Sequence, residues 1–339
     1  MNTGEDAAMR WPVIGHDWAV AFLRRSLAHG RNRHAYLISG SPALGKMTLA
    51  LTFAQALNCE AESPAGRPCL ACRACKAIGR GHDPDLIVAA AEDGAPLKID
   101  AIREAARLLA LKPYSARYRI AVLDDVHMVA PLAQDALLKT LEEPPGHAVL
   151  LLLAAGVERV LPTIRSRAQH LPLRPAPLEL IKRQLIGRGC EEERADLLAR
   201  LSGGRVGWAL SASADDALLV FRDEMLDILS RVLDGARLRR MQESDKLSRR
   251  AGKDKALLRR ALEIWQSYWR DVLLQCYESP VKPCNSDRQA QIRALAARLE
   301  PAAALVALAA TDRTLGALST NANLRLALDA LFLDYPGLE

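Results

Sequence analysis

The sequence is poor in aromatic residues, which make up only 4% of its 339 residues, whereas alanine and leucine dominate. Alanine and leucine favour helices, so we expect a largely helical protein of two or three domains. The sequence also lacks any run of about 18 consecutive apolar residues, the minimum for a membrane-spanning helix. Its first ten residues lack the apolar core of a signal peptide. These absences predict a cytoplasmic protein with no membrane association.

A strong charge imbalance is also missing. The net charge is +6 and the isoelectric point is about 9.0, which is compatible with a nucleic-acid partner but does not by itself indicate one. Charged residues are dense in 237–260, where we expect a solvated helical surface, with a DNA-facing surface as the alternative. Seven cysteines in a reducing compartment do not predict disulfides, and the clustering of four of them predicts a metal site.

The apolar pattern predicts alternating strands and helices in the first half of the chain. Strands are predicted at 34–39, 85–88, 119–123, 148–154 and 165–173, and helices at 11–30, 48–57, 99–111, 131–141 and in a short segment that ends at 161. Such alternation predicts a parallel sheet. After a proline-rich linker at 172–177, the pattern is almost purely helical, with a small unit up to 212 and a larger domain from 213 onward.

A glycine-containing turn after the first predicted strand has the spacing G-x-x-x-x-G-K. Gly40 and Gly45 would let backbone N–H groups wrap a phosphate, and Lys46 would reach the outer phosphates. The next residue should carry a hydroxyl group for Mg²⁺, but it is Met47, whose thioether is a poor ligand for a hard cation. Thr48 lies one position later, about 100° around the helix. The sequence therefore predicts a phosphate cradle with a damaged metal contact.

Two acidic residues, Asp124 and Asp125, end the predicted strand at 119–123. In P-loop ATPases an acid at this place orients Mg²⁺ and a second acid, usually glutamate, acts on the attacking water. Asp125 is one methylene shorter than glutamate, which weakens that second role. The alternative is that both acids simply end a strand at the surface.

Four cysteines, Cys59, Cys69, Cys72 and Cys75, follow the phosphate loop. The last three form two overlapping C-x-x-C steps, and four thiolates satisfy a tetrahedral Zn²⁺ without leaving a position open for catalysis. We therefore expect a structural zinc site at 59–75. An iron–sulfur cluster fits the same ligand count, and unligated or redox-active thiols are a further alternative.

Two arginines, Arg165 and Arg167, follow the short predicted helix, where the last predicted strand begins. In oligomeric ATPases an arginine at this place can enter a neighbour's active site and neutralise charge that grows on the γ-phosphate. The alternative is an ordinary surface or ion-paired arginine.

These pieces together resemble the delta-prime family of bacterial DNA polymerase III clamp-loader subunits, within the AAA+ superfamily. The resemblance extends over about residues 12–210. It rests on Ile14-Gly15-His16, residues 34–38, the phosphate loop, the four cysteines, the run from Leu137 to Pro145, and Arg165-Ser166-Arg167.

The resemblance implies an α/β AAA+ P-loop domain with a RecA-like parallel sheet at 1–172, a small helical lid domain at 173–212 and an all-α collar domain at 213–339. Collar domains of the family hold a five-subunit ring together. The implied partners are the tau/gamma motor subunits and delta, with the sliding clamp and primed DNA reached through the complex. Arg167 matches the family's arginine finger in a Ser-Arg-Cys motif, although Ala168 replaces the cysteine.

Four departures distinguish this chain from the motor subunits. They are Met47, Asp125, the apolar strand end at Ala154-Ala155, and Gly207, which falls where the motors place an arginine unless Arg205 takes that role. Each removes or shortens a polar group needed for hydrolysis, so we expect a scaffold subunit without ATPase activity of its own. Lys46 and both glycines still permit ATP or ADP to bind without turnover. The alternative is an active AAA+ ATPase, a short motor subunit of the tau/gamma type.

Overall fold

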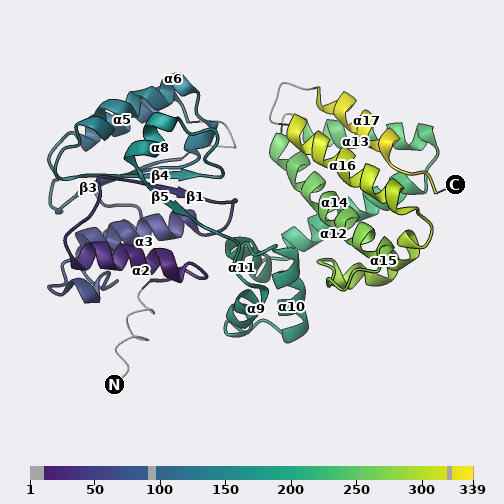
Figure 1. Cartoon of the computed structure of the whole chain (residues 1–339), viewed down its shortest axis with the longest axis horizontal. Helices are drawn as coiled ribbons and strands as arrows, with labels where there is room; N and C mark the ends of the chain where they lie inside the picture. The colour runs from purple at the N-terminus through teal and green to yellow at the C-terminus, as the bar shows by residue number, and fades with distance from the viewer. Residues whose placement is uncertain (1–10, 91–96, 253, 319–322, 339) are drawn as a thin grey trace. The chain divides into compact units, whose positions relative to one another are not determined.

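The computed structural model describes residues 11–90, 97–252, 254–318 and 323–338. The chain divides into two compact units (Figure 1). The first comprises Met1–Leu180 with Gly204–Trp208, and the second comprises Ile181–Gly203 with Ala209–Glu339. The division into three domains at residues 172 and 212 stays a prediction.

The first unit is built on a sheet of five parallel strands in the order β2-β3-β4-β1-β5. The strands are β1 Ala35–Ser39, β2 Leu86–Ala89, β3 Arg119–Leu123, β4 Ala148–Ala154 and β5 Gln169–Pro172. The predicted parallel sheet is confirmed. In this order β1 lies between β4 and β5, so the loop that leaves β1 opens at the carboxyl edge of the sheet, beside the ends of β3 and β4.

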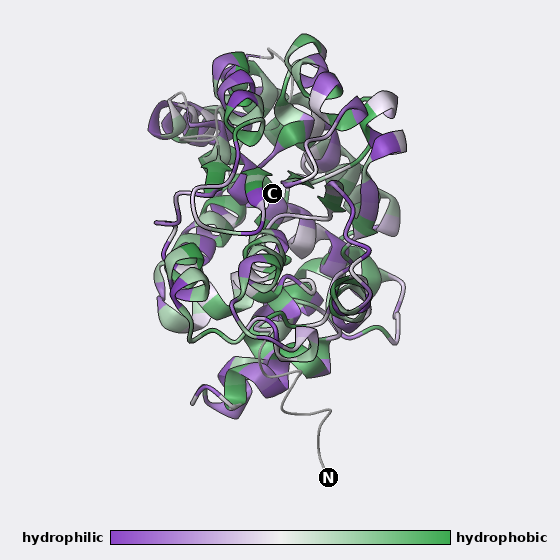
Figure 2. Ribbon diagram, turned by 90° about the vertical axis from the view of Figure 1, so that its left-hand side faces the viewer, coloured by the Kyte–Doolittle hydropathy of each residue, from purple (hydrophilic) through white to green (hydrophobic). Residues whose placement is uncertain are grey.

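Alternate residues of the strands face two separate apolar cores. Tyr36 and Ile38 of β1 belong to the core that α2 (Asp17–Ala28) and α3 (Lys46–Asn58) cover, whereas Leu37 belongs to the core on the side of α5 (Ile99–Leu109). Figure 1 shows α2 and α3 on one face of the sheet and α5 on the other. Figure 2 shows hydrophilic and hydrophobic residues mixed along the helices of the chain, as expected for helices that bury one side.

The short helices of this unit differ in part from the predicted ones. The helix predicted at 131–141 is present but divided into α6 (Pro131–Gln134), the 3-10 turn η3 (Asp135–Leu137) and α7 (Leu138–Glu142). The helix expected to end at 161 is wrong, because α8 begins at Pro162 and runs to Arg167. A proline at the first helical position has a suitable φ and needs no N–H partner, which explains a start there. The last strand is correspondingly shorter than predicted. The remaining short elements are η1 Pro64–Gly66, α4 Arg73–Gly79 and η2 Val126–Met128.

From residue 178 onward the described chain is helical, as predicted. Trp265, Trp269, Phe332 and Tyr335 lie at the centre of the core of the second unit, where their rings contact one another at tilted angles. Within the described parts of the chain, none of the helices has both the length and the apolar character needed to cross a bilayer. The helices are α9 Leu178–Ile186, α10 Glu192–Leu201, α11 Val206–Ala214, α12 Ala217–Leu233, α13 Arg237–Ala251, α14 Lys255–Cys276, η4 Ser286–Arg288, α15 Gln289–Ala296, α16 Pro301–Ala317 and α17 Leu324–Asp334.

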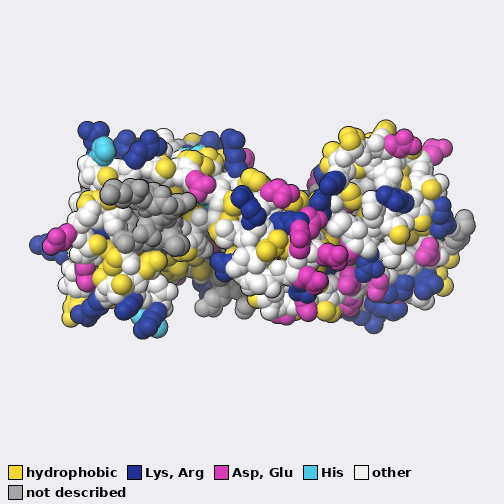
Figure 3. Space-filling view, turned by 90° about the horizontal axis from the view of Figure 1, so that it is seen from below, with side chains coloured by type: hydrophobic (Ala, Val, Ile, Leu, Met, Phe, Trp, Pro, Cys, Tyr) yellow, Lys and Arg dark blue, Asp and Glu magenta, His cyan; other side chains and the backbone are white. Residues whose placement is uncertain are grey.

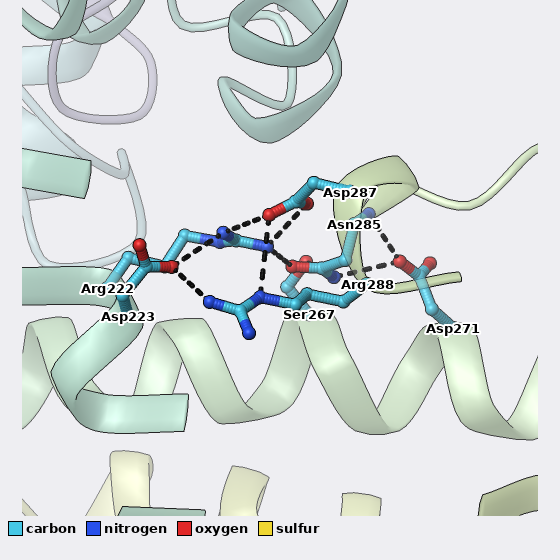
Figure 4. A network of polar contacts seen from close by, with 7 residues as sticks. All are labelled: Arg222, Asp223, Ser267, Asp271, Asn285, Asp287 and Arg288. Carbon is cyan, nitrogen blue, oxygen red and sulfur yellow. Dashed lines mark hydrogen bonds and ion pairs between the residues drawn. The ribbon is translucent and has the colours of Figure 1, made fainter. Parts of the chain in front are cut away.

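A buried polar network ties the segment around η4 to α12 and α14 (Figure 4). The guanidinium of Arg222 donates to both carboxylate oxygens of Asp287, at 2.8 and 2.9 Å, and to Asn285 Oδ1 at 2.8 Å. Asn285 in turn donates through its backbone N–H and its side-chain amide to Asp271 Oδ2, at 2.7 and 2.8 Å. The network thus joins polar groups from distant parts of the sequence inside the second unit.

Candidate functional site

The phosphate loop has the backbone conformation that its glycines predict. Gly40 and Gly45 have φ values of +147° and +91°, and Gly45 is the residue that precedes the first turn of α3. A Cβ atom at Gly40 would lie 2.7 Å from the carbonyl oxygen of Leu173, so no larger residue fits there without a shift of the backbone. The loop therefore needs glycine for two physical reasons. Both residues have positive φ values, and at Gly40 the neighbouring backbone also leaves no space for a Cβ atom.

Lys46 lies folded against its own loop. Its Nζ donates to the carbonyl oxygens of Gly40 and Ser41 at 2.7 and 3.1 Å, and the residue is only 8% exposed. Burial lowers the pKa of Lys46, an effect that the negative charges of Asp125 and Asp124 partly offset. The positive charge of Lys46 in the loop therefore interacts with the carboxylates that follow β3.

The two residues after Lys46 do not restore the missing hydroxyl ligand. Met47 is partly buried and packs against the apolar core beneath α2 and α3, while Thr48 is exposed. The thioether therefore acts as a packing group.

Two further groups lie against carbonyl oxygens of the phosphate loop. His16, which is 1% exposed, lies with Nε2 2.8 Å from the carbonyl oxygen of Leu44, and burial lowers its pKa. The backbone N–H of Gly207, at the start of α11, donates to the carbonyl oxygen of Ala43 at 2.8 Å. A Cβ atom at Gly207 would lie 2.9 Å from the same oxygen, so this residue, which the resemblance aligns with an arginine of motor subunits, is in close backbone contact with the loop.

Arg205, the other candidate for that arginine, lies over the ring of Trp208, with 5.9 Å between its guanidinium carbon and the ring centroid. Its charge therefore already has an aromatic partner.

The acidic pair at the end of β3 lies beside a histidine that the sequence pattern did not indicate. The backbone N–H of Ala155, at the end of β4, donates to His127 Nδ1 at 3.2 Å, and the same nitrogen is 3.8 Å from Asp125 Oδ1. Because a backbone N–H donates to it, Nδ1 is the acceptor nitrogen of the ring, and burial lowers the pKa of His127 in the direction that favours the neutral form. Burial, with the nearby charge of Asp125, raises the pKa of Asp124. The histidine's place three residues after Asp124, directly behind a predicted strand end, is the signal that could have identified it.

Arg167 ends α8 with an exposed side chain. Its Nη2 is 2.9 Å from Glu142 Oε1, and its Nη1 donates to the carbonyl oxygen of Thr163 at 3.2 Å. Glu142 belongs to the Leu137–Pro145 run, and its pairing with the arginine is not visible in the sequence. The structure therefore shows Arg167 as an exposed arginine that is ion-paired at the surface of the first unit.

The four clustered cysteines converge on one point. The sulfur atoms of Cys59, Cys69, Cys72 and Cys75 all lie within 4.8 Å of one another, and Cys69 Sγ is 4.0 Å from Cys75 Sγ. Ligands of a tetrahedral ion at Zn–S distances of about 2.3 Å would lie about 3.8 Å apart, so the group fits such an ion with small movements. This cluster could hold a metal ion through four thiolates.

Backbone N–H groups support thiolates in this cluster. Those of Cys69, Cys72 and Cys75 donate to the sulfurs of Cys59, Cys69 and Cys72 at 3.3, 3.3 and 3.4 Å. Burial alone would raise the pKa of the Cys69 thiol. Hydrogen bonds from the backbone N–H groups of Ala71 and Cys72 outweigh burial and lower this pKa to about 6. Burial raises the pKa of Cys59 and Cys75. A metal ion would supply the positive charge that all four thiolates need.

Comparison with known proteins gives matches over about half to two thirds of the chain. Residues 15–177 match a family model described as "DNA polymerase III, delta subunit". The chain is 36% identical over 181 residues to DNA polymerase III subunit gamma/tau of Mycobacterium bovis, a match that covers 53% of this chain and 31% of that protein. It is 32% identical over 228 residues to subunit tau of Bacillus subtilis, covering 64% of this chain and 38% of the relative. The chain thus spans about a third of the length of these curated relatives.

Solved structures of related description were also found. A DNA polymerase III gamma subunit-related protein from Thermotoga maritima is 16% identical, with a TM-score of 0.39 and coverage of 93% of this chain and 97% of that one. The DNA clamp loader delta protein of Bacillus subtilis is 13% identical, with a TM-score of 0.37 and coverage of 93% and 98%. These matches make the chain similar in sequence to subunits of DNA polymerase III, without distinguishing a delta-prime type from a tau or gamma type. The expected resemblance is confirmed at that level.

Proposed function

We propose that this chain is a delta-prime-type clamp-loader subunit, which does not hydrolyse ATP and lends Arg167 to the nucleotide site of a neighbouring motor subunit. The observation that carries the proposal is the state of its own phosphate loop. Met47 stands where Mg²⁺ needs a hydroxyl and packs into the core, and the position of Gly207 is closed to an arginine by the carbonyl oxygen of Ala43. A site without these groups has lost both a metal contact and a charge that would stabilise the transferring phosphoryl group.

The partners follow from the same proposal. A subunit of this type works in a ring with tau/gamma motor subunits and delta, and meets the sliding clamp and primed DNA as part of that complex. We further propose that the four cysteines hold one structural Zn²⁺, because all four ligand positions are thiolates and no open position remains for chemistry.

Reconstitution with candidate motor and delta subunits tests the role of Arg167. Arg167→Ala should leave ring assembly unchanged by size measurement and should lower the DNA-stimulated ATPase rate of the complex at least about tenfold, since arginine fingers contribute about 10³–10⁵ in rate. Arg165→Ala, an exposed arginine on the same helix, is the matched control and should leave the rate near that of the wild type. An unchanged rate in the Arg167 variant would remove the finger role.

A second candidate is a short, active motor subunit of the tau/gamma type. It is favoured by the curated relatives, which are gamma and tau subunits, and by the surviving Gly40, Gly45 and Lys46. Titration of the isolated chain with a fluorescent ATP analogue, with and without Mg²⁺, distinguishes the two. The scaffold predicts weak binding that Mg²⁺ does not strengthen, because no hydroxyl follows Lys46. A motor predicts binding that depends on Mg²⁺.

A further inference from the structure

A basic hollow lies at the opposite edge of the sheet from the phosphate loop. It has a volume of about 730 Å³ and is formed by the end of α2, the loop that leads into β1 and the first residue of β5. Three arginines, Arg25, Arg31 and Arg33, line it together with His29, and its lining contains no acidic residue. The hollow lies before the amino ends of parallel strands, so it is separate from the nucleotide-binding edge described above.

The positive charge of this hollow is not neutralised within the described structure. Among the residues described, Arg25, Arg31 and Arg33 form no ion pair, and the side chain of Arg25 makes a long hydrogen bond to Ala21 in its own helix. The sequence explains this, since no aspartate or glutamate occurs from residue 18 to residue 59. The positive charges of these arginines repel one another, and a bound polyanion would remove that repulsion.

The other charge-dense part of the chain behaves differently. In α13, Arg249 pairs with Asp245 at 2.8 Å and Lys246 pairs with Glu243 at 2.8 Å. Arg231 of α12 also lies 3.2 Å from the carboxylate of Glu243. Figure 3 shows acidic and basic side chains interleaved over the helical unit. The ion pairs at 237–260 agree with the expected solvated surface. The arginines of the hollow beside α2 have no such acidic partners among the described residues.

We propose that this hollow binds the sugar–phosphate backbone of a nucleic acid. Arginine presents a fork of donors that matches two phosphate oxygens, and it remains charged at any physiological pH. The side-chain amides of Asn32 and Gln169 in the same lining can add neutral hydrogen bonds to phosphate or sugar oxygens. The side chain of Phe22 is partly buried, so base stacking contributes little and recognition is independent of sequence. The inference depends on the charges of this chain alone and does not require the proposed function.

Fluorescence anisotropy with the full-length isolated chain tests the inference. The probes are a labelled single-stranded oligonucleotide and the matching duplex, measured over a series of salt concentrations. The test variant is Arg25→Ser/Arg31→Ser/Arg33→Ser, and the control Arg80→Ser/Arg103→Ser/Arg107→Ser removes the same charge from exposed positions elsewhere on the same unit. Circular dichroism and thermal melting verify that both variants fold.

The wild type and the control should bind with a steep salt dependence. The test variant should bind at least about tenfold more weakly at low salt, and the slope of log K against log salt should fall by about 2–3, because each arginine removed leaves about one phosphate unneutralised. No binding by the wild type at low salt, or equal weakening in both variants, would overturn the inference. If polyglutamate competed as well as DNA at equal charge concentration, the partner would be an acidic protein surface and the nucleic-acid assignment would be wrong.

Discussion

Replacing Arg222 with methionine should lower the free energy of unfolding of the helical unit by about 3 kcal/mol. The side chain of Arg222 is 4% exposed, and it forms two hydrogen bonds to Asp287 and one to Asn285. Methionine fills a similar volume but leaves Asn285 Oδ1 without its donor in a residue that is 1% exposed. Breaking a buried ion pair costs about 3–5 kcal/mol, and we take the low end because the side chain of Asp287 is 29% exposed and can regain water.

Urea unfolding followed by tryptophan fluorescence measures this effect, because Trp265 and Trp269 are fully buried in the same core. The denaturation midpoint should fall while the slope with denaturant stays constant. Arg313→Met is the matched control, since Arg313 pairs with Asp334 at 3.0 Å but both side chains are largely exposed. Its cost should stay below about 1 kcal/mol. Equal midpoints for the two variants would refute the reasoning that burial makes the Arg222 network strong.

Three other predictions concern the first unit. Gly207→Ala should destabilise the protein by about 1–3 kcal/mol, because its Cβ would lie 2.9 Å from the oxygen of Ala43, whereas Gly146→Ala meets no atom within 4 Å and should be near neutral in the same urea assay. Burial alone would raise the pKa of Asp85, but three backbone N–H groups that donate to its carboxylate, with the nearby Arg119 charge, outweigh burial and hold that pKa below its usual value. The stabilising contribution of the Asp85 carboxylate should therefore be complete above about pH 4 and be lost as the pH falls further. Asp85→Asn should be less stable than the wild type at pH 7, and its free energy of unfolding should change less with acid. Parallel pH profiles of the two proteins would contradict this. Elemental analysis should find one zinc per chain, and its removal by a chelator under reducing conditions should lower the melting temperature by more than about 4 °C; absence of bound metal would remove the zinc assignment.

Much of the sheet could be predicted because its residues act locally. Residues 120–123 and 148–154 are continuous apolar runs, and the structure places β3 and β4 there. The phosphate loop could be predicted equally well, since two glycines and a lysine at this spacing are typical of such a loop, and the structure has the expected positive φ values at both glycines. Such signals need no information from distant parts of the chain.

The features that the sequence did not reveal depend on contacts between distant residues. The pairing of Arg167 with Glu142 spans 25 positions and that of Arg222 with Asp287 spans 65, so no periodic pattern announces them. The close approach of Gly207 to Ala43 likewise joins two segments far apart in sequence. The error at 161 has a different cause, since the apolar residues before Pro162 favour a helix there although the proline itself begins the helix.

The steady-state ATPase rate of the purified isolated chain tests the central claim most directly. The account predicts no turnover above background, with or without DNA, and the same background for Lys46→Ala. Turnover at a rate typical of AAA+ motors that disappears in Lys46→Ala would show a working nucleotide site and contradict the account.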